Sequence, residues 1–311
     1  MINEERITIR GEVNLGATIA YQNKDEKRPL VLLIAGTGSL DRDGYALGFK
    51  SNIYKELSDM FVDMGYVCIR YDKRGTHESK TKDMSFGLND LVNDAANIIH
   101  YAKGLEFVDE DRVVVCGHSE GAMIATLLTK NEDLKGIILL SGACTSLKEA
   151  MLYQNYLVLD QVKDMKGLLG WLLRKTMKKE DIEKQVSALF SKSEECKKNM
   201  FFYRGSLLPT KYINEHGSLT KENYIELLKE YKGKILAITG QSDVQADYRV
   251  LEDITSFENA TISSPEQLNH MLRDVEGESN IMNIKQEYKL SFKKPISSKL
   301  KDLIKEWSEN I

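Results

Sequence analysis

Short runs of apolar residues alternate with helix-like segments along most of this 311-residue chain. The runs lie at residues 30–35, 66–71, 112–116, 137–140 and 234–239. A short, continuous apolar run suits a strand that is buried on both faces of a parallel sheet. The segments between them carry apolar residues at helical spacing, at 51–64, 88–103 and 119–130. Strands that alternate with helices need crossover connections, so the pattern predicts an α/β fold with a mostly parallel sheet.

Two regions depart from this alternation. Residues 7–19 alternate apolar and polar side chains, which predicts an antiparallel hairpin at the edge of the sheet. Residues 146–230 are rich in Lys, Glu, Met and Leu and have helical spacing without an inner-strand run. A last helix is expected at about 296–310. We therefore expect a core of residues 1–145 and 231–311, with a helical cap, or lid, inserted at 146–230.

Composition excludes several classes of function. The net charge of −4 argues against a nucleic-acid-binding face, which is usually basic. The four cysteines are scattered, so the sequence predicts neither a metal nor a redox cofactor. No run of about 18 apolar residues is present, so stable membrane insertion is not expected. The charged first residues are not followed by an apolar segment, and we expect no signal peptide and a cytoplasmic location.

Ser119 is the candidate nucleophile. It lies in the sequence Gly117-His118-Ser119-Glu120-Gly121, which follows one predicted strand and opens a predicted helix. Such a strand–turn–helix context lifts a serine hydroxyl off the edge of the sheet, whereas the five-residue pattern alone also occurs by chance. The alternative is a glycine-bounded turn in which the serine only caps the helix.

A serine hydroxyl needs a base to remove its proton, and the chain has five histidines. His270 follows the last short strand and fits the order serine, acid, histidine that is typical of hydrolases with this elbow. Asp243 directly follows the strand at 234–239 and is the candidate that orients the imidazole. Asp247 is its rival, while Asp253 is expected in the next helix.

The developing oxyanion needs hydrogen-bond donors, which are usually backbone N–H groups. One is expected from Glu120, directly after the nucleophile at a helix N-terminus. The other is expected from Thr37, or next from Gly38, in the loop after the first inner strand. That loop has no third glycine of a dinucleotide fingerprint and no Gly-Lys-Ser/Thr of a phosphate loop, which argues against a bound nucleotide.

These segments together resemble the α/β-hydrolase superfamily over roughly residues 5–145 and 232–310. The segments that carry the resemblance are residues 36–44, 71–75 and 117–121 together with Asp243 and His270. The Asp41-Arg42-Asp43-Gly44 turn is similar to a bacterial branch of carboxylesterases and serine-aminopeptidase-like hydrolases. The resemblance implies a central sheet of about eight strands flanked by helices. His77 departs from it, because the family pattern usually has glycine there; either the loop is reshaped or His77 faces the pocket.

Two further groups of side chains, the charged turn at 41–43 and the apolar residues of the insertion, can each be structural or functional. Asp41, Arg42 and Asp43 either bind substrate or form an ion-paired turn that holds the oxyanion loop, which we favour. The insertion carries apolar residues that either pack on the body, as we expect, or form an acyl or aromatic pocket over Ser119. These residues are Met151, Tyr153, Tyr156, Leu157, Leu168, Leu169, Trp171, Leu172, Phe201, Phe202 and Tyr203.

The sequence thus predicts a serine carboxylesterase that acts on a small-molecule ester through an acyl-enzyme, without cofactor or metal. An aminopeptidase or an acyl-CoA thioesterase with the same triad is the alternative. A peptidase would need acidic groups near its pocket, and Glu194, Glu195 and Glu215 are the candidates. A catalytically inactive binding protein with this fold is a third interpretation. A homodimer stays an open alternative for its assembly.

Overall fold

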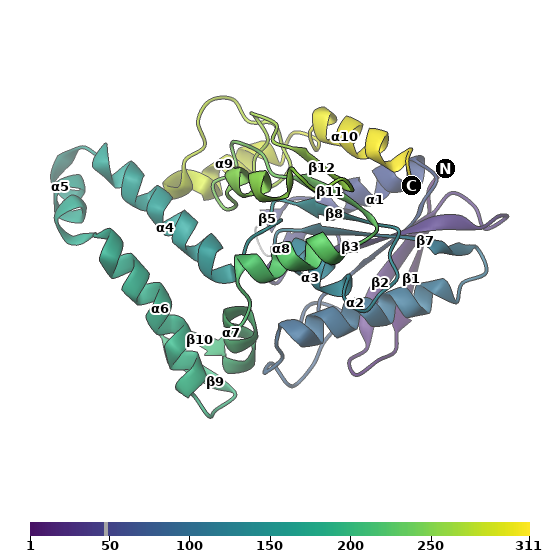
Figure 1. Cartoon of the computed structure of the whole chain (residues 1–311), viewed down its shortest axis with the longest axis horizontal. Helices are drawn as coiled ribbons and strands as arrows, with labels where there is room; N and C mark the ends of the chain where they lie inside the picture. The colour runs from purple at the N-terminus through teal and green to yellow at the C-terminus, as the bar shows by residue number, and fades with distance from the viewer. Residues whose placement is uncertain (47–48) are drawn as a thin grey trace.

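The computed structural model describes residues 1–46 and 49–311 (Figure 1). Within these residues, eight strands form one sheet in the order β1-β2-β6-β3-β7-β8-β11-β12. Their bounds are β1 (Asn3–Ile9), β2 (Leu15–Tyr21), β3 (Arg28–Ile34), β6 (Val67–Tyr71), β7 (Val108–His118), β8 (Gly136–Leu140), β11 (Lys234–Ile238) and β12 (Ala260–Ser263). β4 (Tyr45–Ala46) and β5 (Phe49–Lys50) pair as a separate, two-stranded antiparallel sheet.

The sheet is mostly parallel, as the sequence predicts. β1 and β2 form an antiparallel hairpin at one edge, in which Ile9 pairs with Leu15, and β2 is also antiparallel to β6. From β6 to β12 every neighbouring pair is parallel. The predicted α/β class, the edge hairpin and the sheet of about eight strands are therefore confirmed.

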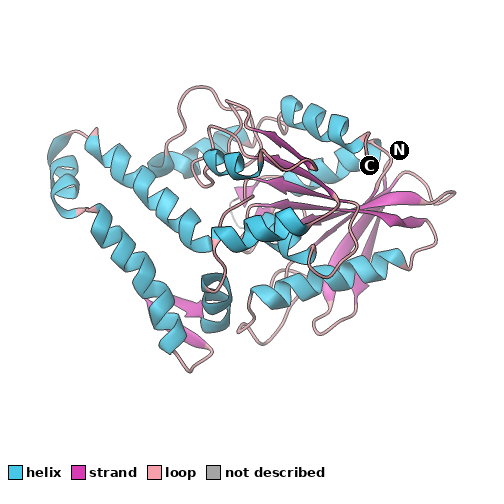
Figure 2. Ribbon diagram, in the orientation of Figure 1, coloured by secondary structure: helices cyan, strands magenta, loops and turns pink. Residues whose placement is uncertain are grey.

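Helices cover both faces of the sheet (Figures 1 and 2). α1 (Ile53–Asp63) and α10 (Ser298–Ser308) contribute buried residues to the apolar cluster on one face. α2 (Leu88–Lys103) and α3 (Glu120–Leu128) contribute to the cluster on the other face. Because both faces are covered, the inner strands are apolar without alternation, as in β8, whose residues are all buried.

The insertion at 146–230 forms five helices and a short hairpin among the described residues. They are α4 (Leu147–Lys163), α5 (Gly167–Thr176), α6 (Lys179–Glu195), β9 (Met200–Tyr203), β10 (Ser206–Pro209), α7 (Thr210–Gly217) and α8 (Lys221–Glu230). In Figure 1, α4 and α6 extend away from the sheet and α5 joins them at the far end. α7 returns to the body, and α8 packs beside α3, with Leu228 in the core of that face.

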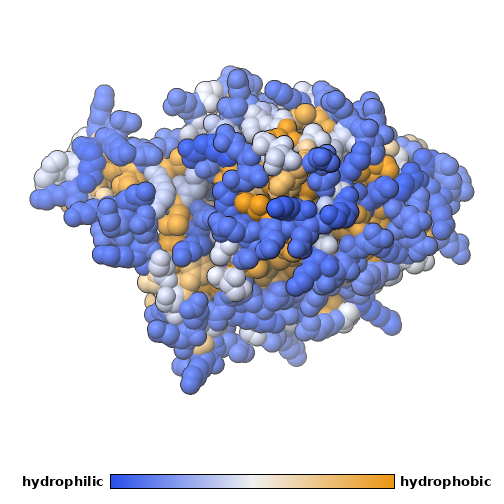
Figure 3. All heavy atoms as spheres, viewed as in Figure 1, coloured by the Kyte–Doolittle hydropathy of each residue, from blue (hydrophilic) through white to orange (hydrophobic). Residues whose placement is uncertain are grey.

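The apolar residues of the insertion are distributed differently from the prediction. Phe201 is buried in a small cluster with Val186, Leu189, Phe190 and Ile213, which holds the lower part of the insertion together. By contrast, four apolar side chains of α5 are exposed, so the expectation that they pack on the body is wrong. These are Leu168, Leu169, Trp171 and Leu172. Figure 3 shows hydrophilic residues over most of this face, with apolar patches where the insertion approaches the body.

Three further short helices complete the C-terminal part: η1 (Tyr248–Ile254), η2 (Ile281–Asn283) and α9 (Ile284–Ser291). No helix in residues 1–46 and 49–311 is both long and apolar enough to cross a membrane.

Candidate active site

The candidate site residues lie at one edge of the sheet, where the parallel strands end. Ser119 follows β7, Asp243 follows β11, His270 comes after β12, and Thr37 follows β3. The carboxyl ends of parallel strands meet at the same edge, so residues far apart in the sequence come together there. The structure brings all of these predicted residues into one site.

Ser119 occupies a strained turn between β7 and α3. Its backbone has φ 56° and ψ −121°, a left-handed φ that a side chain rarely adopts. The turn fits only because glycine stands on either side. A Cβ on Gly117 would lie 2.0 Å from the carbonyl oxygen of Gly121, and a Cβ on Gly121 would lie 2.1 Å from that of Ile34. The Ser119 N–H donates to the carbonyl of Leu140 at 2.8 Å, which holds the turn against β8.

Ser119, His270 and Asp243 form a hydrogen-bonded chain. The Nε2 atom of His270 lies 3.2 Å from Ser119 Oγ. Its Nδ1 atom lies 2.9 and 3.1 Å from the two carboxylate oxygens of Asp243. Because a carboxylate only accepts, Nδ1 carries the hydrogen and Nε2 is free to accept the serine proton. The Asp243 carboxylate also accepts from the N–H groups of Gln245 and Ala246, at 2.8 and 2.9 Å, which fix its position.

The rival acids lie elsewhere. Asp247 caps η1 by accepting from the N–H of Arg249, and its carboxylate pairs with the Arg249 guanidinium at 2.8 Å. Asp253 lies in η1, as predicted, and its carboxylate pairs with Lys221. Within the part of the chain that the structure describes, neither carboxylate contacts His270. Of Asp243, Asp247 and Asp253, Asp243 is the one that contacts the imidazole.

His118 has a role in the site that the sequence did not indicate. Its Nε2 atom donates to the backbone carbonyl of His270 at 2.8 Å, and its Nδ1 atom lies 3.1 Å from the Tyr54 hydroxyl. That hydroxyl in turn accepts from the N–H of Gly36 at 2.8 Å. Burial lowers the pKa of His118 to about 3, so the ring is neutral and connects the oxyanion loop to the main chain of His270.

The two residues expected to donate to the oxyanion flank Ser119. Glu120 is the first residue of α3, where the N–H groups of the first turn have no partner within the helix. Thr37 follows Gly36, at which a Cβ would lie only 3.0 Å from Ser119 Cβ. The loop therefore passes directly beside the nucleophile. Gly38, the second choice for this donor, is exposed and has φ 118°.

The side chain of Glu120 is the centre of a buried polar cluster. Its carboxylate contacts Lys73 Nζ at 2.6 Å, His216 Nε2 at 3.2 Å and the hydroxyl of Tyr212. Burial alone would raise the pKa of Glu120, but the Lys73 charge and the His216 contact outweigh it and lower the pKa, so the carboxylate is ionised. Sequence analysis missed this cluster, because the spacing of Tyr212 and His216, one helical turn apart, predicts a shared face of a helix but not the residue that this face contacts.

A cavity of about 500 Å³ lies above Ser119 and His270. Its lining is mainly apolar, and it includes α4 from the insertion and α9 from the C-terminal part. The apolar lining residues include Leu40, Met123, Leu147, Ala150, Met151, Ala246, Met271, Ile284 and Tyr288. Cavities of this size and character bind small organic molecules.

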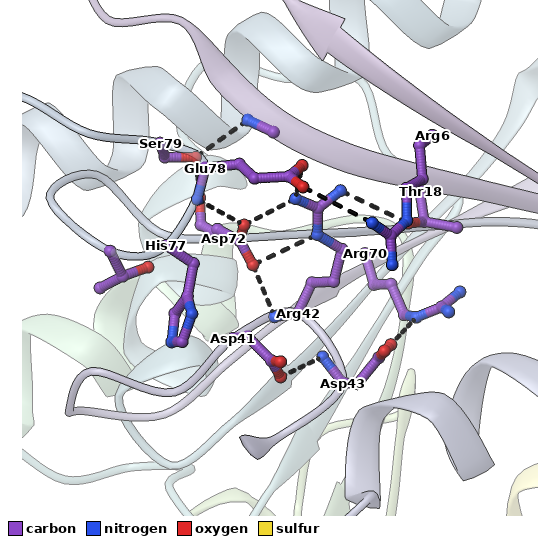
Figure 4. A network of polar contacts seen from close by, with 12 residues as sticks. Arg6, Thr18, Asp41, Arg42, Asp43, Arg70, Asp72, His77, Glu78 and Ser79 are labelled. Atoms are coloured by element: carbon purple, nitrogen blue, oxygen red, sulfur yellow. Dashed lines mark hydrogen bonds and ion pairs between the residues drawn. The ribbon is translucent and has the colours of Figure 1, made fainter. Parts of the chain in front are cut away.

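The loop that carries Thr37 is held from the far side by ion pairs (Figure 4). The Arg42 guanidinium contacts the Asp72 carboxylate at 2.6 Å, and the Arg42 N–H donates to the same carboxylate at 2.7 Å. Asp43 pairs with Arg70 at 2.6 Å. This agrees with the favoured expectation of an ion-paired turn. His77, with φ 39°, contacts the carbonyl of Ser39 at 3.2 Å and lines a charged groove on this side.

Comparison with known proteins gives three kinds of similarity: a relative in sequence, solved structures of similar fold, and a family match. Esterase EstD of Thermotoga maritima is 25% identical over 285 residues, which cover 89% of this chain. The chain spans only 61% of the length of that relative. Est1E of Butyrivibrio proteoclasticus, solved with ferulic acid bound, superposes with a TM-score of 0.57 at 17% identity, covering 91% of this chain and 96% of that one.

The Pyrococcus furiosus esterase Pf2001 superposes with a TM-score of 0.55 at 11% identity, covering 99% of this chain and 93% of that one. At such identities these structures show a shared fold, which agrees with the sheet and crossovers described above. The family of S33 serine aminopeptidases matches residues 47–208, slightly more than half of the chain, including the elbow at Ser119. The chain therefore belongs to the S33 serine aminopeptidase family of α/β hydrolases.

Proposed function

We propose that this protein hydrolyses carboxylic esters through an acyl-enzyme formed on Ser119. The observation that carries the proposal is the hydrogen-bonded chain from Ser119 Oγ through His270 to Asp243, at 3.2 and 2.9 Å, beneath an apolar cavity. The similarity to esterase EstD and to the fold of two other esterases supports it.

In the proposed reaction, His270 Nε2 takes the proton of Ser119 as Oγ attacks the ester carbonyl. Asp243 keeps the imidazole in the correct tautomer and stabilises the imidazolium. The N–H groups of Glu120 and Thr37 donate to the oxyanion of the tetrahedral intermediate. When the intermediate collapses, the C–O bond to the alcohol breaks and His270 returns the proton to the leaving oxygen. Water, activated by His270, then attacks the acyl group and releases the acid. This route requires no metal or cofactor.

The cavity supports an ester with an apolar acyl or aromatic group. Its lining offers methionine and aliphatic side chains from α3, α4 and α9. A polar acyl chain would lose its hydration there without replacement partners. Ferulic acid, bound in Est1E, is an aromatic acid, and an aromatic acyl group of similar bulk fits the proposal for this chain.

An aminopeptidase is less well supported, because the predicted acidic residues are not placed for it. Glu215 accepts from the N–H of Asn89 at 2.7 Å, on the α2 side of the insertion. Glu194 and Glu195 lie at the end of α6. Among the described residues that line the cavity, Glu120 is the one carboxylate, and Lys73 neutralises it. Lys285, also in the lining, would repel a substrate ammonium group.

We further propose that the insertion at 146–230 acts as a lid. Leu147, Ala150 and Met151 of α4 line the cavity, so a movement of α4 would open it. A cytoplasmic location and a homodimer stay predictions from the sequence, as does the absence of a nucleic-acid partner.

The experiment is to compare wild type with Ser119→Ala on p-nitrophenyl esters of increasing chain length, with Ser308→Ala as the control. Removing the nucleophile should lower kcat by about 10⁴-fold or more, while a serine on α10, at the far end of the chain, should leave it unchanged. A fluorophosphonate probe should label the wild type and the control only. Full activity of Ser119→Ala would contradict the proposal.

A further inference from the structure

Helix α7 of the insertion presents two polar rings to the residue that follows the nucleophile. Tyr212 and His216 are four residues apart, so they share one face of the helix, and their ring centroids are 4.5 Å apart. His216 Nε2 lies 3.2 Å from Glu120 Oε1, and the Tyr212 hydroxyl donates to the same oxygen. Glu120 is 4% exposed and His216 is 1% exposed. The insertion therefore contacts the nucleophile turn through a buried, charged hydrogen-bond cluster.

The Tyr212 hydroxyl faces the residue that follows the nucleophile. It donates to the carboxylate of Glu120. Burial raises the pKa of Tyr212, and the Glu120 charge raises it further, so the hydroxyl is protonated and donates to the carboxylate. The Tyr212 hydroxyl thus contacts the side chain of Glu120, whose N–H group is one of the two proposed oxyanion donors.

The helix that carries Tyr212 is itself fixed to the body. The Glu215 carboxylate accepts from the N–H of Asn89 at 2.7 Å, and Lys211 contacts Asp90 at 2.7 Å. Both partners lie in the first turn of α2. Lys73, which follows β6, holds the other oxygen of Glu120 at 2.6 Å. Tyr212 therefore lies between two anchored elements rather than on the outlying arm formed by α4, α5 and α6.

We propose that Tyr212 is a positioning residue that fixes Glu120, and with it the Glu120 N–H group, beside Ser119, so that the oxyanion site is complete only when α7 is docked. The inference rests on the proposed ester hydrolysis and deepens it. Oxyanion donors act only within a narrow range of distance from the developing charge, so a small shift of Glu120 should reduce catalysis more than substrate binding. The proposal gives the insertion a part in catalysis besides covering the cavity.

The test compares Tyr212→Phe with Tyr224→Phe in the full-length protein. Tyr224 is a matched control, because it is a buried tyrosine whose hydroxyl has no hydrogen-bond partner among the described residues. With p-nitrophenyl butyrate, Tyr212→Phe should lower kcat about tenfold to a hundredfold and leave KM within about twofold. The affinity for a trifluoromethyl ketone, which forms an oxyanion on the serine, should fall by a similar factor. Tyr224→Phe should match the wild type in both measurements.

A double-mutant cycle adds a second criterion. In a Glu120→Gln background, Tyr212→Phe should have little further effect, because the two side chains act through the same contact. The inference would be overturned if Tyr212→Phe had the same kcat and the same ketone affinity as the wild type. It would also be overturned if the variant lost activity only through a raised KM or through unfolding in a thermal melt. If the wild type neither hydrolyses the ester nor reacts with a fluorophosphonate, the proposed function fails and the inference falls with it.

A separate observation concerns the outer end of the insertion. In α5, Leu168 is 80% exposed and Trp171 is 53% exposed, with Leu169 and Leu172 beside them on the outward face. Gly170 lies on the inward face, where the chain packs so closely that a Cβ would lie 2.1 Å from the carbonyl oxygen of Met165. The helix thus packs through its glycine and presents its largest apolar side chains to the outside, at the point farthest from the sheet in Figure 1.

The charges around this apolar face are basic on balance. Residues 160–181 carry six lysine or arginine side chains and four aspartate or glutamate side chains, in a chain whose net charge is −4. Lys175 Nζ lies 5.3 Å from the Trp171 ring centroid, so one of these cations borders the apolar face directly. Exposed leucine and tryptophan with lysine at their border are typical of helices that lie in the headgroup region of a membrane. A second copy of the chain would bring the same cations together and be repelled.

We infer that α5 docks on an anionic phospholipid surface and lies in its interface without crossing it. Lysines near an anionic bilayer are attracted to it, and the apolar side chains strengthen binding by the area that they bury. The catalytic cavity lies at the other end of α4 from α5. Docking through α5 would therefore leave the cavity outside the bilayer.

The test uses the fluorescence of the two tryptophans. Trp307 is buried in the body, so Trp307→Phe leaves Trp171 as the reporter. Vesicles of phosphatidylglycerol and phosphatidylcholine should shift Trp171 emission to the blue and sediment the protein, whereas phosphatidylcholine alone should do neither. Replacing Leu168, Leu169 and Leu172 by serine should abolish sedimentation, while Leu290→Ser, an equally exposed leucine on α9, should not. No shift with anionic vesicles, or a dimer in sedimentation velocity that the serine variant abolishes, would overturn the inference.

Discussion

His118 is a buried histidine, and the groups packed around its imidazole determine its protonation state. Its Nε2 atom donates to a carbonyl at 2.8 Å and its Nδ1 atom faces a tyrosine hydroxyl at 3.1 Å. A proton added at Nδ1 would face the Tyr54 oxygen, which already accepts from Gly36. The ring also lies 5.0 Å from that of His270, whose proposed imidazolium form would repel a second cation. Neutral His118 is thus compatible with a charged His270 during catalysis.

His118 should make the protein sensitive to moderate acid. Its pKa is about 3 in the folded chain, below the ordinary value of 6.5, so on acidification the unfolded chain takes up the proton first. The stability that His118 contributes is present above pH 6.5 and is lost as the pH falls toward 3. Between pH 7 and pH 5 the free energy of unfolding should fall by about 2 kcal/mol from this group alone. Urea unfolding at several pH values measures this loss.

The controls are His118→Asn, which does not titrate, and His100→Gln. His100 is an exposed histidine on α2 that pairs with Glu132 at 3.0 Å. The asparagine variant should show a flatter dependence of stability on pH between 5 and 7 than the wild type, whereas the His100 variant should keep the wild-type slope. Equal slopes in all three proteins would mean that His118 is already protonated or partly solvated in the folded state.

At the scale of elements, the loops after β3 and β6 act as one unit. Asp72 accepts from the N–H and the guanidinium of Arg42 and from the N–H of Glu78, so one carboxylate joins both loops (Figure 4). The Arg42 and Asp72 side chains are both buried. Glu78 also contacts Arg42, but its side chain is 53% exposed. The buried pair therefore contributes to the placement of the loop that carries Thr37.

Asp72→Asn should destabilise the protein by about 3 kcal/mol, because it leaves the Arg42 charge buried with only an exposed partner. Glu78→Gln should change the stability by less than about 1 kcal/mol, since water screens that pair. Denaturant unfolding of both variants tests the difference. Equal effects of the two substitutions would show that the Arg42 charge is solvated in the folded protein.

Strands, helices and the candidate triad follow from local patterns, but the contacts around Glu120 do not. Apolar runs located β3, β6 and β8, and the carboxyl edge of the sheet then placed Ser119 near His270. Tyr212 comes from an insertion whose path depends on tertiary packing, so no spacing in the sequence indicates that it meets Glu120. Phe201 and Phe202, which the sequence groups with the apolar residues of the insertion, lie on β9, where one is buried and the other exposed because successive side chains of a strand point to opposite faces.

At the scale of the whole molecule, the apolar residues form two large clusters and one small one. The two large clusters lie on opposite faces of the sheet and include nearly all of its strands. The small cluster, within the insertion, has five buried residues, and most of α4 is only half-buried. Local stability follows the buried apolar area, so the insertion should open at a lower free energy than the sheet. α7 is the exception within it, because its polar contacts to Glu120, Asn89 and Asp90 join it to the body.

Amide hydrogen exchange should therefore show three levels of protection. Amides of α4, α5 and α6 should exchange by local opening, several kcal/mol below the global free energy of unfolding, whereas those of β3, β7 and β8 should exchange only by global unfolding. α7 should lie between these levels, and Tyr212→Phe should lower its protection without changing that of β7, because the substitution removes a contact of α7 and leaves the sheet core intact. Protection of α4–α6 equal to that of the sheet would show that the insertion and the body unfold as one unit, and that α7 needs no anchoring by Glu120.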